Sequence, residues 1–201
     1  MLKNIIVYDF DKTIYGGETS TDFMRFFLKR NPKYIFKIYK VIHSLMYYRS
    51  DLKKSKEIFF EILSNIEIEY LNKEIHAFWI ENKYKIFPWI YEEIKKNKNQ
   101  AEELILISAT PKIFLEEISK ELGFDKLIAT NFIKQDKYFV SKIEGKNCKH
   151  VEKVHRLKEY LQDFNILIFY SDSMSDKPLF DLAQKKYYIN KGIKKEGLPN
   201  E

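Results

Sequence analysis

The sequence has very little that could cross-link the chain or anchor it in a membrane. Its 201 residues include one cysteine, so no disulfide can form within the chain, and a reducing, cytoplasmic compartment is the expected location. The four histidines are scattered and have no cysteine partners, which argues against a zinc site. No run of about eighteen apolar residues occurs, and we expect neither a membrane span nor a signal peptide.

Composition and charge favour a globular protein. Apolar residues make up 45% of the chain and aromatic residues 16%, enough for one good core with room for a substantial insertion. The excess of 35 Lys and Arg over 29 Asp and Glu gives a formal charge of +6. This charge fits an anionic partner, but an ordinary soluble surface explains it more simply. The basic residues form no recognisable nucleic-acid-binding motif, so nucleic acid is not an expected partner.

Three apolar segments predict strands of one buried sheet, namely residues 4–9, 103–108 and 165–171. They are uncharged through the middle and do not alternate with polar residues, which is typical of parallel strands buried on both faces. Helical patterns lie between them. One covers residues 112–122, with Thr110 as the expected cap, Pro111 as the first-turn residue and Gly123 as the stop. Alternating strands and helices predict an α/β fold with a Rossmann-like parallel sheet.

Residues 19–88 interrupt this alternation. They show helical periodicity, contain few glycines and offer no convincing strand. We therefore expect a helical cap domain over residues 19–88 and a core domain made of residues 1–18 and 89–201. Further along, two short β runs around Gln135 and Asp136 predict a small β-hairpin flap beside the sheet.

Polar residues that can carry chemistry stand where each predicted strand ends. Asp9 and Asp11 follow the first strand, Ser108 ends the second, and Asp172 and Asp176 follow the third. Ligands bind at the carboxyl ends of the strands in an open parallel sheet, so we expect these residues to share one crevice. Clustered carboxylates repel one another unless a cation neutralises them, and hard oxygen ligands suit Mg²⁺.

Carboxylates with one magnesium ion indicate phosphoryl chemistry. Asp9 would attack phosphorus to form an aspartyl phosphate, which splits hydrolysis of a phosphomonoester into two steps. Asp11 would protonate the leaving oxygen and later take a proton from the hydrolytic water. Ser108, with the N–H groups at the start of the next helix, can hold phosphate oxygens, and Lys153 can offset charge on the transferring group.

The same residues carry a resemblance to a known family. The segments DFDKT, ISAT, NCKHVEK and SDSMSD resemble, in this order, the four motifs of the haloacid dehalogenase (HAD) superfamily, and the resemblance covers essentially the whole chain. The second aspartate of the first motif favours a phosphatase over the family's dehalogenases and transport ATPases. The resemblance implies a nucleophile at Asp9, an acid and base at Asp11, phosphate binding by Ser108 and Lys153, and Mg²⁺ binding by Asp9, the Asp11 carbonyl and Asp172, with Asp176 supporting the metal shell.

A helical cap between the first two motifs is similar to the branch that contains phosphoserine phosphatase and bacterial phosphatidylglycerophosphatase C. The segments TDFMRFFLKRNP and YSDSMSDKPLF look closer to the second enzyme, which makes a lipid phosphate such as phosphatidylglycerophosphate the expected substrate. Glu18, nine residues after the nucleophile, matches a substrate-contacting glutamate of phosphoserine phosphatases, so a small soluble monoester stays open. In place of the arginine and the glycine of those enzymes the chain has Lys53, Lys54, Lys56 and Ser171.

The segment that follows Pro32 has two interpretations. It is apolar except for a narrow face of Lys37, Lys40 and Ser44, which predicts a helix packed inside the cap. Alternatively, part of its surface lies against an anionic membrane, so that the protein is peripheral to the inner face of that membrane. The basic residues available for this contact are Lys29, Arg30, Lys33, Lys37, Lys40 and Arg49.

Two further alternatives to hydrolysis stay open at this point. An aspartyl phosphate can be passed to an alcohol instead of water, which would make the protein a phosphotransferase or phosphomutase. The chain could also be a membrane- or protein-binding module that keeps a phosphatase core without turnover. The presence of all four motifs argues against this second alternative.

Overall fold

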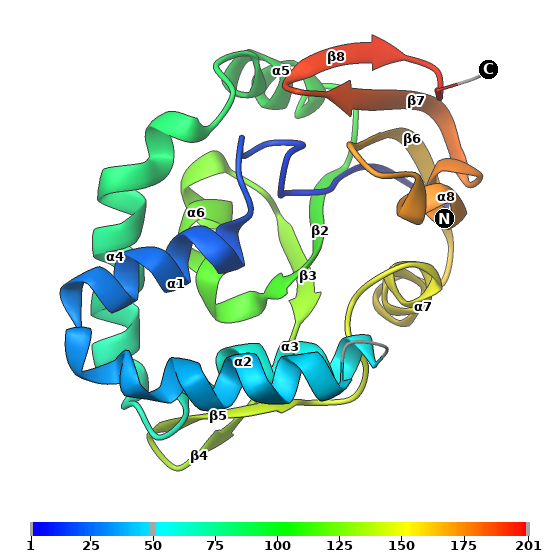
Figure 1. Ribbon diagram of the computed structural model, residues 1–201. Coiled ribbons are helices and arrows are strands. Elements are labelled where there is room, and N and C mark those ends of the chain that lie inside the picture. Colours follow the sequence, from blue (N-terminus) through cyan, green and yellow to red (C-terminus); the bar gives the residue numbers. More distant parts are fainter. Residues whose placement is uncertain (1, 49–50, 200–201) are drawn as a thin grey trace.

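The computed structural model describes residues 2–48 and 51–199. At its centre is a six-stranded sheet with the strand order β3-β2-β1-β6-β7-β8 (Figure 1). Neighbouring strands are parallel, except that β8 runs antiparallel to β7. The strands are β1 (Lys3–Tyr8), β2 (Glu103–Pro111), β3 (Lys126–Thr130), β6 (Phe164–Ser171), β7 (Ala183–Asn190) and β8 (Ile193–Glu196). The three segments predicted as parallel strands are β1, β2 and β6.

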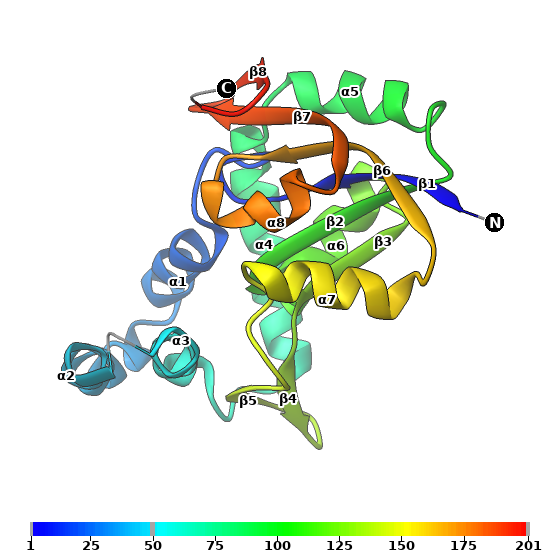
Figure 2. The same ribbon diagram turned by 90° about the vertical axis from the view of Figure 1, so that its right-hand side faces the viewer.

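Helices cover both faces of the sheet, which explains the unbroken apolar runs. Ile6 and Tyr8 of β1 pack into one hydrophobic cluster with residues of α5 (Trp89–Asn97) and α6 (Lys112–Leu122). Ile5 and Val7 point to the other face and pack with α7 (Val151–Tyr160) and α8 (Lys177–Phe180). In Figure 2, α7 lies on the near side of the central strands and α6 on the far side. The expected Rossmann-like α/β fold is confirmed.

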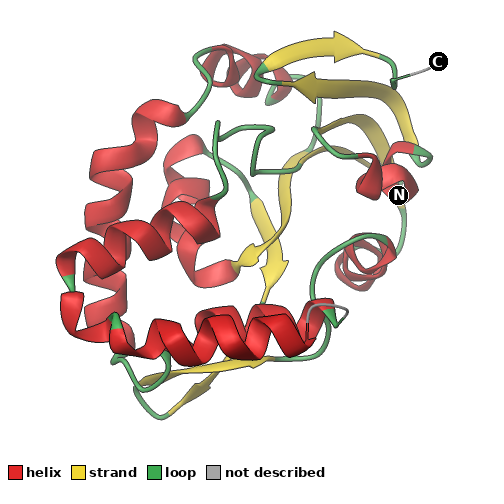
Figure 3. Cartoon of the chain, in the orientation of Figure 1, coloured by secondary structure: helices red, strands yellow, loops and turns green. Residues whose placement is uncertain are grey.

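A helical insertion follows β1, as expected. It contains α1 (Thr19–Arg30), η1 (Pro32–Tyr34), α2 (Phe36–Tyr48), α3 (Leu52–Phe60), η2 (Glu61–Leu63), α4 (Ile68–Asn82) and η3 (Lys83–Lys85). The predicted hairpin is also present as β4 (Phe132–Gln135) and β5 (Tyr138–Ile143), paired antiparallel. Helix α3 packs on β5, so the hairpin supports the far end of the insertion, at the bottom of Figure 3. No described helix is long and apolar enough to cross a membrane.

Two local predictions were wrong. Thr110 and Pro111 belong to the end of β2, and the side chain of Thr110 does not cap α6. The helix after Pro32 was expected to bury its apolar side chains, yet Phe36 and Tyr39 are largely exposed. The physical reason is that Lys37 takes up the inward position, where its ammonium donates to two backbone carbonyls. The Lys40 side chain and Arg49 lie outside the described part of the chain.

Candidate active site

The loop after β1 places two carboxylates at the carboxyl edge of the sheet. The Asp9 N–H donates to the Tyr170 carbonyl of β6 at 2.9 Å, so the sheet itself fixes this residue. Lys12 has φ 58°, a left-handed backbone conformation that reverses the chain at this point. The chain beyond Lys12 thus turns back towards Asp11, so that Thr19 at the start of helix α1 meets its carboxylate.

Lys153 joins Asp9 to Asp176. Its ammonium donates to Asp9 Oδ1 at 2.6 Å and to Asp176 Oδ2 at 2.7 Å. The Lys153 side chain is 3% exposed, and both carboxylates are buried with it. The Ser171 hydroxyl also donates to Asp176 Oδ2, at 2.8 Å. The other oxygen, Asp176 Oδ1, is buried without a hydrogen-bond partner among residues 2–48 and 51–199.

Asp11 is held by three hydrogen bonds. The backbone N–H of Thr19, the first residue of α1, donates to Asp11 Oδ1 at 2.8 Å, and the Thr19 hydroxyl donates to the same oxygen. The Thr110 hydroxyl donates to Asp11 Oδ2 at 2.6 Å, across from the end of β2. Burial raises the pKa of Asp11 although these donors lower it. The carboxyl group is therefore fixed in place, and it binds a proton more readily than an exposed aspartate does.

Burial and neighbouring charges together set the charge states of the other groups in the pocket. It raises the pKa of Asp9 to about 7, against the lowering effect of Lys153. It raises the pKa of Asp172 to about 6, against the lowering effect of Lys12. Burial opposes the positive charge of Lys153, but Asp9 and Asp176 outweigh it and raise the pKa of this lysine. The ammonium therefore stays charged between its two carboxylates.

Thr13 connects the ends of two strands, whereas Ser108 makes its hydrogen bond within the end of its own strand. Ser108 is fully buried near the end of β2, and its hydroxyl accepts a hydrogen bond from the Thr110 N–H at 3.1 Å. It does not cap α6, which starts at Lys112. The Thr13 hydroxyl accepts from the Asp172 N–H at 2.9 Å and makes a long contact of 3.4 Å to Asp9 Oδ2. The end of β1 is thereby tied to the loop after β6.

All the predicted site residues line one pocket of about 270 Å³. Its walls come from the ends of β1, β2 and β6, from α7 and from the insertion. The sequence-predicted members are Asp9, Asp11, Ser108, Lys153, Asp172 and Asp176, and Glu18 also lines the pocket. The remaining lining residues are Lys12, Lys56, Ala109, Asn147, Lys149, Ser173 and Ser175.

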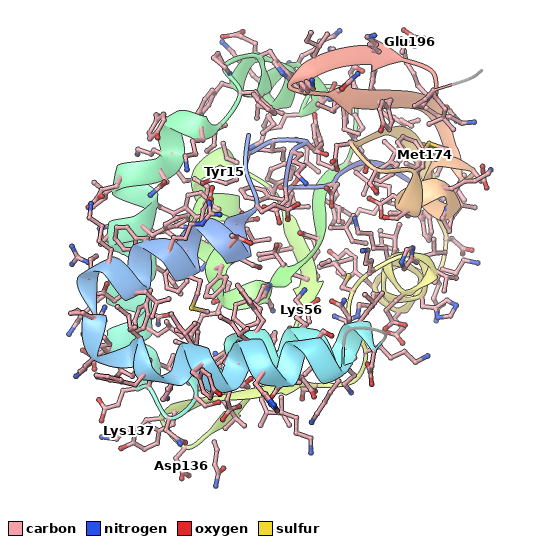
Figure 4. The ribbon with its side chains drawn as sticks, viewed as in Figure 1. Tyr15, Lys56, Asp136, Lys137, Met174 and Glu196 are labelled. Atoms are coloured by element: carbon pink, nitrogen blue, oxygen red, sulfur yellow. The ribbon has the colours of Figure 1, made fainter. Side chains whose placement is uncertain are left out.

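Lys56 reaches this pocket from α3 of the insertion (Figure 4). Its ammonium donates to the Ala109 carbonyl and, at 3.1 Å, to Asn147 Oδ1. Burial lowers the pKa of Lys56 to about 8. Of the three lysines noted in the sequence, Lys53 instead donates to the Gly145 carbonyl at 2.6 Å. Lys54 lines a different pocket, between α2 and α3.

Several positioning residues were not predicted from the sequence. Thr19 and Thr110 hold Asp11, and Thr130 donates to the Ala109 carbonyl at 2.6 Å and to Asn147 Oδ1 at 2.9 Å. In the sequence, Thr110 and Asn147 stand out only because they lie inside the segments ISAT and NCKHVEK, whereas Thr19 and Thr130 lie outside the four segments. Nothing in the spacing shows that a lysine of the insertion would meet Asn147.

The donor set fits a magnesium ion that keeps part of its water shell. Asp9, Asp172 and the Asp11 carbonyl offer hard oxygens, and the partnerless Asp176 Oδ1 is a buried acceptor beside them. Among the described residues, no three Asp, Glu, His or Cys side chains are placed to hold a metal by themselves. A backbone carbonyl and waters would therefore have to complete the shell, which is usual for Mg²⁺.

Comparisons with known proteins identify the family of the chain. Residues 6–181 match the haloacid dehalogenase-like hydrolases, so the chain belongs to this family of enzymes. Protein CicA of Caulobacter vibrioides is 22% identical over 196 residues, which cover 92% of this chain and 85% of CicA.

Solved structures share the fold. A protein of unknown function from Bordetella pertussis Tohama I superposes with a TM-score of 0.79 at 20% identity, over 92% of this chain and 89% of the other. A phospho-aspartyl intermediate analogue of phosphoserine phosphatase superposes with a TM-score of 0.59 at 22% identity, over 92% of this chain and 86% of the other. At these identities the similarity establishes the fold alone.

Proposed function

We propose that the chain is a Mg²⁺-dependent phosphomonoesterase that works through an aspartyl phosphate on Asp9. The observation that carries the proposal is the pairing of Asp9 with the buried Lys153, beside an Asp11 carboxyl fixed by Thr19 and Thr110. A nucleophile, a proton donor and a cation thus line the same pocket. When bound, Mg²⁺ would neutralise charge on the phosphate and on the carboxylates of Asp9 and Asp172.

Two steps complete the proposed reaction. In the first, an Asp9 oxygen bonds to phosphorus, the bond from phosphorus to the ester oxygen breaks, and Asp11 gives its proton to the departing oxygen. In the second, water attacks phosphorus, Asp11 takes back a proton, and the bond to Asp9 breaks to release phosphate. The Lys153 ammonium, 2.6 Å from Asp9 Oδ1, would stabilise the negative charge that returns to the Asp9 carboxylate when this second bond breaks.

We propose that residues 19–88 act as a cap domain over a core domain of residues 1–18 and 89–201. Lys56 supports this arrangement of cap over core, because its side chain extends from the insertion to Ala109 and Asn147 of the core. A cap of this kind excludes bulk water and presents the side chains that select the substrate, whereas the core residues contact only phosphate.

A small soluble phosphomonoester is the better-supported substrate. The pocket is small and lined mainly by charged and polar side chains, and one of the similar solved structures is a phosphoserine phosphatase. The comparisons reported above give no specific support to the phosphatidylglycerophosphatase C similarity that suggested a lipid phosphate.

A phosphate-release screen tests this proposal. The panel holds phosphoserine, an aryl phosphate, other soluble monoesters and dispersed phosphatidylglycerophosphate, each with and without Mg²⁺. We expect Mg²⁺-dependent release from a soluble monoester. Release from the lipid alone would contradict the substrate class, and transfer to an added alcohol in place of hydrolysis would indicate a phosphotransferase. No release from folded protein would overturn the enzymatic proposal in favour of a binding module.

Magnesium is expected to stabilise the protein more at about pH 8 than at about pH 5.5. Because burial raises the pKa of Asp9 and Asp172, their contribution to stability is present at low pH and is lost as the pH rises through about 6 to 7. Mg²⁺ binds the deprotonated carboxylates and thereby restores the stability that is lost at the higher pH. Thermal unfolding with and without Mg²⁺ at the two pH values measures the difference. An equal shift at both values, or a shift that persists in Asp172→Asn, would contradict the proposed metal ligands.

A further inference from the structure

Among the described residues, four large apolar side chains in α2 and directly before it are exposed to solvent. Phe36 is 86% exposed and Tyr39 78%, and Ile35 and Ile42 are about half exposed. At 100° per residue these positions fall on one stripe that covers about a third of the helix circumference, and the exposed His43 falls on the same stripe. Figure 2 shows α2 at the edge of the molecule, with α3 between it and the hairpin. We call these four residues the α2 face.

The inward side of α2 carries both apolar and polar side chains, since Ile38 packs against the core while Lys37 and Ser44 are half-buried. Lys37 turns inward, and its ammonium donates to the Ile62 and Ser64 carbonyls at 3.3 and 3.2 Å. Val41 is buried nearby. An amphipathic helix ordinarily directs its apolar stripe towards the protein interior, and a contiguous exposed apolar stripe marks an interaction surface. The α2 face has the character of such an interaction surface.

Charge identifies the kind of partner. The 28 residues from Phe23 to Ser50 contain seven Lys and Arg and no Asp or Glu, whereas the remainder of the chain has one more acidic than basic residue. The net positive charge of the protein thus comes from this segment, which includes most of α1 and all of α2. Lys29 and Lys33, just before the helix, are exposed. Lys40 and Arg49 enter this count from the sequence alone.

We propose that the α2 face docks on an anionic lipid surface. Phe36 and Tyr39 would enter the interfacial region, and Lys29 and Lys33 would contact the negative headgroups, as in interfacial amphipathic helices. A second copy of the chain fits less well, because symmetric pairing through this face would bring two acid-free basic segments together. This inference goes beyond the proposed phosphatase activity and does not require it.

Vesicle flotation of the full chain tests the proposal. The vesicles are pure phosphatidylcholine or phosphatidylcholine mixed with phosphatidylglycerol, at low and at high salt. We expect binding to the anionic vesicles only, and weaker binding at high salt. The double variant Phe36→Ser/Tyr39→Ser should bind at least about tenfold more weakly. Tyr84→Ser is the matched control, since Tyr84 is 77% exposed but lies in η3, away from the α2 face, and should bind as the wild type does.

Three results would overturn the proposal. One is the absence of binding to anionic vesicles, and another is equal binding by wild type and double variant. The third is a dimer in gel filtration that the double variant converts to monomer, which would assign the face to a second copy. Aryl phosphate hydrolysis without vesicles should be unchanged in the double variant, because its residues do not line the pocket of Asp9. A loss of that hydrolysis would show that the double variant is misfolded. Lys33→Glu would then replace it in the flotation assay.

Discussion

Replacing Asp9 by Asn lowers kcat/KM for phosphate release at least about a thousandfold, if Asp9 is the nucleophile. The amide keeps the size of the side chain and leaves Lys153 its contact with Asp176, so the fold should survive. What it removes is the negatively charged oxygen that bonds to phosphorus. Steady-state kinetics on the best substrate of the screen measure the effect.

The matched control for this change is Asp181→Asn. Asp181 is an exposed aspartate that pairs with Lys177 at 2.6 Å and does not line the pocket. It should retain wild-type kinetics, because surface ion pairs contribute little. Circular dichroism should show that both variants are folded. A folded Asp9→Asn enzyme with more than about a tenth of wild-type activity would rule out nucleophilic catalysis by Asp9.

Replacing Lys153 by Met should lower the free energy of unfolding by about 3–5 kcal/mol. The methionine fills a similar volume but leaves Asp9 and Asp176 buried without their counter-charge. Removal of one partner from a buried ion pair is costly because the remaining charge is shielded from water and no opposite charge compensates it. Urea unfolding of wild type and variant without added Mg²⁺ measures the difference.

The loss caused by Lys153→Met should also depend on pH. Without Lys153, whose charge lowers the pKa of Asp9, the buried Asp9 carboxyl takes up a proton more readily in the folded variant than in its unfolded chain. The variant therefore loses most stability at about pH 8 and less at about pH 5. Lys158→Met is the control on the same helix, since Lys158 is exposed and should change stability by under about 1 kcal/mol. A Lys153→Met penalty as small as that of Lys158→Met would show that the buried pairing does not support the fold.

The sheet and its helices could be predicted because their sequences are locally consistent. Residues 4–9 and 103–108 are apolar without alternation, which is the pattern of strands buried on both faces, and the structure covers both faces with helices. The helix at residues 112–122 stops at Gly123, which has φ 84° in the structure. Local signals of this kind do not depend on distant parts of the chain.

The contacts across the pocket could not be predicted, because they join residues far apart in the sequence. Thr110 meets Asp11 only after β1 and β2 pair in the sheet, and Lys56 meets Asn147 only after the insertion folds over the core. The orientation of α2 was predicted wrongly for a related reason. Its periodicity identified an apolar stripe, but the inward position of Lys37 depends on hydrogen bonds to the Ile62 and Ser64 carbonyls, which lie about 25 residues further along the chain.

The most direct test of the proposed mechanism is to look for the phosphate bond on Asp9. Wild-type protein mixed with Mg²⁺ and its best substrate is quenched in acid and digested, and the peptides are analysed by mass spectrometry. We predict a hydroxylamine-sensitive phosphate on the peptide that contains Asp9, and none in Asp9→Asn. Rapid hydrolysis without any such adduct, or with the phosphate on another residue, would contradict the mechanism.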